Sequence, residues 1–195
     1  DYLEMLDYLQ TSGAALAGII DRPRSNQVLS LVHLSCLCPD EITSESLHYL
    51  DKFERISDAM LFSNLAPGER SALFMNASSE NLHKYQPRGH KMCFFYVNAG
   101  QPGWTSLLRV EIPVWVAQDV DKLQLVHAGV LEQCRATGGF PYVLMRAHEL
   151  AVVSTYERRQ VDNMVAQTMI KRGLSPMVSR KAQGKLWVSH VKNRW

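Results

Sequence analysis

The residues best suited to binding or catalysis in this chain lie in the stretch Ala15–Ser25, which reads ALAGIIDRPRS. Asp21 follows a run of small and apolar residues that is typical of a buried strand, and Arg22 and Arg24 come directly after it. A carboxylate at the end of a strand, beside two guanidinium groups, is suited to holding a divalent cation against a phosphodiester. The alternative is an aspartate that caps a turn, with two solvated arginines, because short motifs often match by chance.

Three further side chains could contribute to such a site. Glu4 and Asp7 lie three residues apart in a predicted helix, Tyr2–Gln10, where either of them could point toward Asp21. His148 falls at the border of the apolar stripe of a second predicted helix, and its ordinary pKa suits a general base or a metal ligand. Exposed carboxylates and a structural histidine are the alternatives.

Several basic residues could contact phosphate. Arg70 follows the turn at Pro67-Gly68, where its guanidinium could bind phosphate oxygens or, alternatively, tie down its own loop. Residues 163–195 contain seven basic residues and no acidic one, with Trp187 and Trp195 interleaved. We therefore consider Lys181 and Lys185, in the basic C-terminal segment 174–195, to be candidates for binding nucleic acid. A solvated terminal segment is the alternative.

Length and composition indicate one globular domain over residues 1–195, because 46% of the residues are hydrophobic and 21% are charged. The four cysteines are too scattered for a disulfide framework, and Cys36 and Cys38 lack the spacing of a zinc site. Free thiols indicate a reducing cytoplasm. The sequence contains no apolar run of membrane-spanning length. Because the first residue is aspartate, we expect the natural protein to begin earlier.

The elements that must position these groups follow from hydrophobic periodicity. Two strands, Lys91–Val97 and Leu107–Trp115, are predicted to form a hairpin, with Pro113 placing the second strand at a sheet edge or a bulge. Glu111 is either the cross-strand partner of a lysine or an additional acid of the site. Ser25 and Ser57 are predicted helix caps. A helix is predicted over Asp119–Arg135, with His127 packed in the core. A second is predicted to start at Pro141, and its buried side chains are Val143, Leu144 and Leu150. A third is predicted over Thr155–Gly173, with Val161, Met164 and Val165 facing inward.

Four stretches, in the same order along the chain, resemble the NurA family, nucleases that work with the HerA translocase in DNA end processing. They are Leu16–Ser25, Ser57–Phe74, the strand FFYVN followed by Leu107–Ala117, and Pro141–Ser154. The resemblance implies an α/β fold of the RNase H-like type, with a central mixed sheet flanked by helices. It also implies a Mn²⁺-dependent nuclease, with Mg²⁺ as the alternative metal and a two-metal site, that acts on duplex ends and single strands of DNA. The expected assembly is a homodimer on a HerA-type ATPase.

The resemblance assigns roles to individual residues. Asp21 matches the acidic residue at the end of the family's internal strand, and His148, in the sequence RAHE, matches its histidine near the C-terminus. Glu4 matches the glutamate of the preceding helix, with Asp7 as the competing choice. Asp21, Glu4 and His148 are therefore the expected catalytic and metal-binding residues, and Arg22 and Arg24 would bind the flanking phosphates.

One motif of the family is missing. The aspartate of an Asp-Gly-Ser turn on the opening strand would precede residue 1 of this sequence. Either this chain lacks its opening strand, or the protein lacks a principal metal ligand and is a non-catalytic subunit that binds DNA and HerA. A third reading is an unrelated α/β domain whose acids and histidine are structural.

Overall fold

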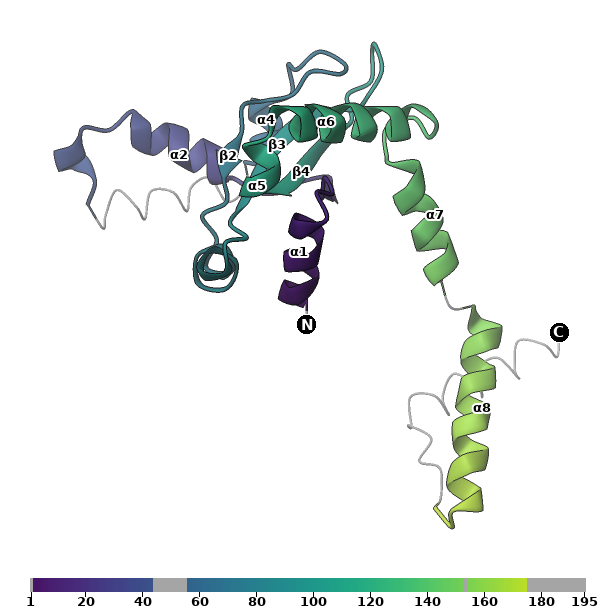
Figure 1. Cartoon of the computed structure of the whole chain (residues 1–195). Coiled ribbons are helices and arrows are strands. Elements are labelled where there is room, and N and C mark those ends of the chain that lie inside the picture. The colour runs from purple at the N-terminus through teal and green to yellow at the C-terminus, as the bar shows by residue number, and fades with distance from the viewer. Residues whose placement is uncertain (1, 44–55, 153, 175–195) are drawn as a thin grey trace. The chain divides into compact units, whose positions relative to one another are not determined.

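The computed structural model describes residues 2–43, 56–152 and 154–174 (Figure 1). The chain divides into two compact units, Asp1–Ala147 and His148–Trp195, and all of the described strands belong to the first. Its described helices and helical turns are α1 (Tyr2–Thr11), α2 (Gln27–Ser35), η1 (Pro39–Glu41), α4 (Asp58–Leu61), η3 (Asn81–Tyr85), η4 (Gln86–Arg88), α5 (Val114–Ala117) and α6 (Val120–Arg135). Helix α7 (Tyr142–Ala151) links the units, and α8 (Thr155–Lys171) lies in the second.

A four-stranded sheet forms the centre of the first unit, in the order β1-β4-β3-β2. Its strands are β1 (Gly18–Asp21), β2 (Phe74–Met75), β3 (Met92–Asn98) and β4 (Leu107–Pro113). The hairpin of β3 and β4 confirms the predicted pair of strands. The α/β class is confirmed as well. All three pairings among the described strands are antiparallel, whereas a mixed sheet was expected.

The two faces of the sheet carry separate apolar clusters. Leu108, Val110 and Ile112 of β4 are fully buried on one face, where they pack with residues of α6. Phe94 and Tyr96 of β3 project from the opposite face and pack with Val28 of α2. Alternate residues of β4 therefore face the same side of the sheet, as the alternation of apolar residues in its sequence predicts.

Helix α6 lies over the first of these faces, and its ends follow the sequence signals. The Asp119 side chain accepts hydrogen bonds from the backbone amides of Asp121 and Lys122 at 3.1 Å, which caps the first turn. Gly138 and Gly139 follow the helix with φ values of 77° and 129°, a backbone that favours glycine. His127 packs against Phe95 and shares a hydrogen bond of 3.0 Å with the Gly68 carbonyl, as expected of a packed histidine.

Two expectations about strands are wrong. The stretch 15–21 was predicted to be a buried strand, yet β1 is four residues long and Ile20 is 41% exposed, because β1 lies at the sheet edge. Pro113 does not mark an edge strand, since β4 has neighbours on both sides. Proline is tolerated there because it is the last residue of β4 and lies beyond Glu111, where the pairing with β1 ends.

The predicted buried stripes of the last two helices are also wrong for the described residues. Val143 and Leu144 of α7 are 52% and 38% exposed, and Val161 and Met164 of α8 are 56% and 67% exposed. The helices themselves form, and Ser154 begins α8 with a capping box to Glu157. Periodicity indicates which side of a helix is apolar but not what covers it. Among the described residues, no helix is both long and apolar enough to cross a bilayer.

Candidate nuclease site

Asp21 is the last residue of β1 and its side chain is 51% exposed. Arg22 follows with φ of 50°, a left-handed backbone that ends the strand sharply. Its Nε lies 3.8 Å from the Asp21 carboxylate, but the Arg22 side chain is 92% exposed, so this pair contributes little to stability. The carboxylate thus faces solvent, where it can take up a metal ion, and the neighbouring guanidinium is open to a phosphate.

The loop that displays Arg22 and Arg24 is fixed by a residue far along the chain. Asp58 is fully buried, and its carboxylate accepts hydrogen bonds from the amides of Val28 and Leu29 at 3.2 and 2.9 Å. Its own amide donates to the Ser25 carbonyl at 2.7 Å. Asp58 therefore caps α2 in place of the predicted Ser25, whose Oγ accepts a hydrogen bond of 3.2 Å from the amide of Gln27.

Sequence reasoning missed Asp58. It treated the preceding residue, Ser57, as the cap of α4, but Ser57 makes no side-chain capping bond. The Tyr96 hydroxyl donates to Asp58 Oδ2 at 2.8 Å, and burial together with this hydrogen bond raises the pKa of Tyr96 to about 12. The signal that was available is an acidic residue that opens an apolar helix, 30 residues after Val28 of α2.

Helix α1 carries both of the competing acids, and the structure distinguishes them. The Asp7 carboxylate shares a hydrogen bond of 2.8 Å with Nε2 of the buried His90, and Arg88 lies 4.0 Å away. Glu4 is exposed in the first turn of the same helix. Asp7 thus joins α1 to the turn before β3, and Glu4 is kept as the ligand that the family resemblance assigns.

Glu111 does not belong with Asp21. Asp21 pairs with Leu108, which packs on the α6 side of the sheet, whereas Glu111 binds Arg109 at 2.7 Å. The Arg109 guanidinium lies 3.6 Å from the centre of the Phe94 ring, on the opposite face. The expected lysine partner is therefore wrong. The partner is an arginine two residues earlier on the same strand and face.

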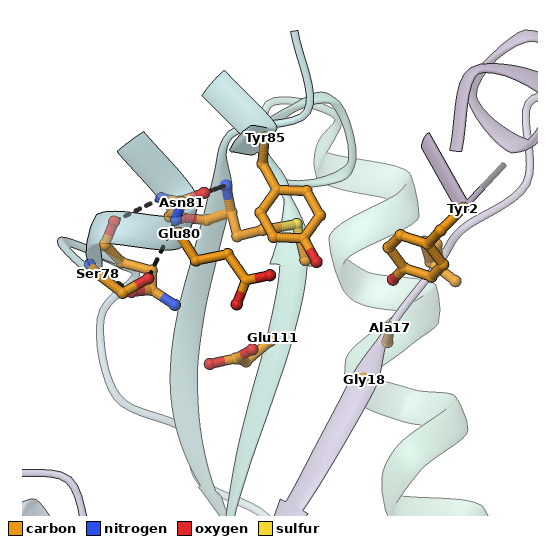
Figure 2. Close-up of a pocket in the computed structure, with 11 residues that line it drawn as sticks. Tyr2, Ala17, Gly18, Ser78, Glu80, Asn81, Tyr85 and Glu111 are labelled. Atoms are coloured by element: carbon orange, nitrogen blue, oxygen red, sulfur yellow. Dashed lines mark hydrogen bonds between the residues drawn. The ribbon is translucent and has the colours of Figure 1, made fainter. Parts of the chain in front are cut away.

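Glu111 instead lines a pocket of about 300 Å³ together with Glu80 and Tyr85 (Figure 2). Burial, and then the negative charges of Glu80 and Glu111, raise the pKa of the Tyr85 phenol. Glu80 is paired with Lys84 at 2.9 Å. The residues around this pocket include neither Asp21 nor Glu4, so it is distinct from the predicted site.

The other predicted site residues, His148, Arg70 and the two lysines, lie outside β1 and the loop that follows it. His148 is exposed on α7 at the start of the second unit and borders no buried stripe. Arg70 donates to the Ser71 carbonyl at 3.1 Å and lies over the Phe95 ring, which favours its alternative role of tying down its own loop. Lys181 and Lys185 lie outside the described residues.

Within residues 2–43, 56–152 and 154–174, no three histidine, cysteine, aspartate or glutamate side chains gather closely enough to hold a metal. The chemistry of the donors nevertheless suits a hard cation, since Asp21 and Glu4 are carboxylates and His148 supplies an imidazole that Mn²⁺ accepts.

Comparison with known proteins adds one result. No curated protein and no solved structure matches the chain. The family model described as NurA domain matches residues 1–153, which include β1, the sheet, α6 and His148. Because this match covers more than half of the 195 residues, the chain belongs to the NurA family, a family of nucleases that act in DNA repair.

Proposed function

We propose that this chain is a Mn²⁺-dependent deoxyribonuclease, with exonuclease and single-strand endonuclease activity, that acts in DNA end resection and double-strand break repair. The observation that carries the proposal is the solvent-facing Asp21 carboxylate at the end of β1, followed by the exposed Arg22 and Arg24, in a chain of the NurA family. Mg²⁺ is the alternative metal.

The proposed ligands are Asp21 and Glu4, with His148 as a third ligand or a proton-transfer group. When bound, one or two divalent ions would neutralise charge on the phosphate and activate the attacking water. The exposed guanidiniums of Arg22 and Arg24 would hold the neighbouring phosphates through forked hydrogen bonds. Asp58 would act at a distance, by fixing the loop from which both arginines project.

The proposal extends to the setting of the reaction. We propose that the fold is RNase H-like, and that the protein works in the cytoplasm as a homodimer with a HerA-type ATPase. Family membership supports these points. Lys181 and Lys185 of the basic C-terminal segment would add phosphate contacts for single-stranded DNA.

Cleavage of labelled single-stranded DNA by the full chain, with and without Mn²⁺, tests the proposal. Asp21→Asn should lower the rate at least 100-fold, because it removes a charged ligand but keeps the side-chain size. Asp121→Asn, an exposed aspartate in the first turn of α6, is the matched control and should cleave at the wild-type rate. Equal rates for the two variants would contradict the assignment of Asp21. DNA binding without Mn²⁺-dependent cleavage in the wild type would instead favour the non-catalytic subunit.

A further inference from the structure

The turn between β3 and β4 exposes a large aromatic side chain. Trp104 is 58% exposed, although an indole is among the side chains that gain most from burial. Residues 99–106 form this turn, which carries the hairpin beyond the sheet (Figure 1). An indole left in solvent on an ordered turn is a feature that the fold itself does not explain.

The backbone around Trp104 is held by a set of hydrogen bonds. Gln101 and Trp104 exchange two backbone bonds of 3.0 and 2.9 Å, so the tip of the turn is closed. At its base, the Asn98 Oδ1 accepts from the amides of Gly100 and Ser106 at 2.9 and 3.2 Å. The turn is therefore ordered by its own polar contacts and does not need the indole to be buried.

The indole also has a support on one side. The six-membered ring lies against the backbone of Gly138 and Gly139, the pair that follows α6. A Cβ atom built on Gly139 would lie 3.2 Å from Cη2 of the indole, and one on Gly138 would lie 3.9 Å from Cζ3. The Ser106 hydroxyl joins the two loops by donating to the Gly139 carbonyl at 3.0 Å. The two glycines thus give room for a ring that is supported on one side and open on another.

This ring lies at the same end of the sheet as the proposed site. Asp21 pairs with Leu108, and Asn98 pairs with Leu107, so β1 ends where the β3–β4 hairpin leaves the sheet. Arg22 and Arg24 follow the last residue of β1 at this end of the sheet, and Trp104 is four residues before Leu108 in the chain. An aromatic surface and two exposed guanidiniums at one end of a sheet form the combination that binds the bases and phosphates of a single strand.

We propose that Trp104 is a stacking site for a nucleobase of single-stranded DNA. This inference rests on the proposed nuclease function, because the position of Asp21 and the two arginines selects DNA over a protein as the ligand. The indole would stack on a base of the strand whose phosphates reach the end of β1. Stacking of this kind tolerates any base, since every base presents a flat aromatic face.

Fluorescence anisotropy of a labelled oligo(dT) 20-mer, titrated with the full chain in EDTA to prevent cleavage, tests this site. Trp104→Ala should weaken binding by about 5- to 150-fold, the range for loss of one base–aromatic stack. Trp104→Phe should retain most of the affinity. Leu125→Ala, which truncates a side chain of α6 that is 65% exposed, is the matched control and should bind as the wild type does.

A second oligonucleotide, with the same phosphates but abasic sugars, separates stacking from damage to the fold. The wild type should bind it more weakly than oligo(dT), whereas Trp104→Ala should bind the two alike. The slope of binding against salt should be the same in both proteins, because the indole contacts no phosphate. Equal loss on both oligonucleotides would overturn the proposal, because it would mean that the loop has collapsed.

The remaining outcomes distinguish the two proposals. If the wild type binds and cleaves single-stranded DNA while Trp104→Ala binds oligo(dT) normally, the stacking site is wrong and the nuclease function stands. If Trp104→Ala instead changes only the oligomeric state seen in sedimentation, the indole is a protein contact, which also overturns the site. If the wild type neither binds nor cleaves single-stranded DNA, the proposed function itself fails.

Discussion

Asp21 and Glu111 project from opposite faces of the sheet, although they lie on paired strands. The partner of Asp21 in the register is Leu108, which is buried against α6, while Glu111 is joined to Arg109 on the side of Phe94. Residues directly opposite in an antiparallel pair share a face, so a separation of three residues along β4 changes the face. One of the two acids can serve a site at the end of β1, and the other supports the fold.

The first prediction follows from this separation. Glu111→Gln should keep Mn²⁺-dependent cleavage within about twofold of the wild type and should lower the free energy of unfolding by about 1–3 kcal/mol, because a buried guanidinium loses its charged partner. Cleavage rates and urea denaturation of the same samples measure the two effects. A loss of cleavage with unchanged stability would place Glu111 in the site and contradict the assignment by face.

Asp58 should be the most sensitive polar residue of the first unit. Asp58→Ala removes a buried acceptor of three hydrogen bonds and should cost about 3 kcal/mol or more in urea denaturation. Asp58→Asn keeps an acceptor and should cost less. The neighbouring change Ser57→Ala is the control and should stay within about 0.5 kcal/mol, because Ser57 makes no capping bond. Similar losses at both positions would argue against Asp58 as the cap of α2.

Alkaline pH should reveal the Tyr96–Asp58 pair. The pKa of Tyr96 is raised in the folded protein to about 12, above its ordinary value of about 10. The raised pKa adds about 2–3 kcal/mol to the free energy of unfolding. This contribution is fully present below pH ~10 and is lost as the pH rises toward ~12. Urea denaturation between pH 8 and 12 should show this decline in the wild type, beyond that in Tyr96→Phe. Parallel curves for the two proteins would mean that the phenol titrates normally.

Two glycines should respond oppositely to alanine. Gly129 lies in α6 with open space around it, so Gly129→Ala should raise the free energy of unfolding by about 0.5–1 kcal/mol through helix propensity. At Gly100 a Cβ would meet the Trp104 carbonyl and would lie 2.6 Å from the Ser106 amide, and neither backbone group can yield easily. Gly100→Ala should therefore lower the thermal midpoint. A rise in both midpoints would show that the β3–β4 turn is loosely held.

The parts of the fold that sequence predicts correctly are those with a local cause. The β3–β4 hairpin and α6 follow from alternation, a capping aspartate and paired glycines, all within a few residues. Whether a strand lies at the edge of the sheet, in contrast, depends on the order of the strands, which is set by residues far apart in the sequence. For that reason β1 proved more exposed than its apolar residues suggest. The exposed stripes of α7 and α8 have the same origin, because periodicity carries no information about a covering partner.

The candidate site shows the same division. The exposed Asp21 with its two arginines could be recognised from eleven consecutive residues. The roles of Asp7 and Glu111 could not, because their partners, His90 and Arg109, are chosen by helix docking and by strand face. Asp58 was missed for a related reason: its hydrogen bonds reach residues about 30 and 38 positions away.

The most direct test of the central claim is the effect of Mn²⁺ on thermal stability of the full chain. A metal that binds only the folded state at 100 times its Kd adds about 2.7 kcal/mol, which should raise the midpoint of the wild type and of Asp121→Asn by several degrees. Asp21→Asn should show little or no rise. Equal stabilisation of Asp21→Asn, or no stabilisation of the wild type, would contradict the claim that Asp21 binds the catalytic metal.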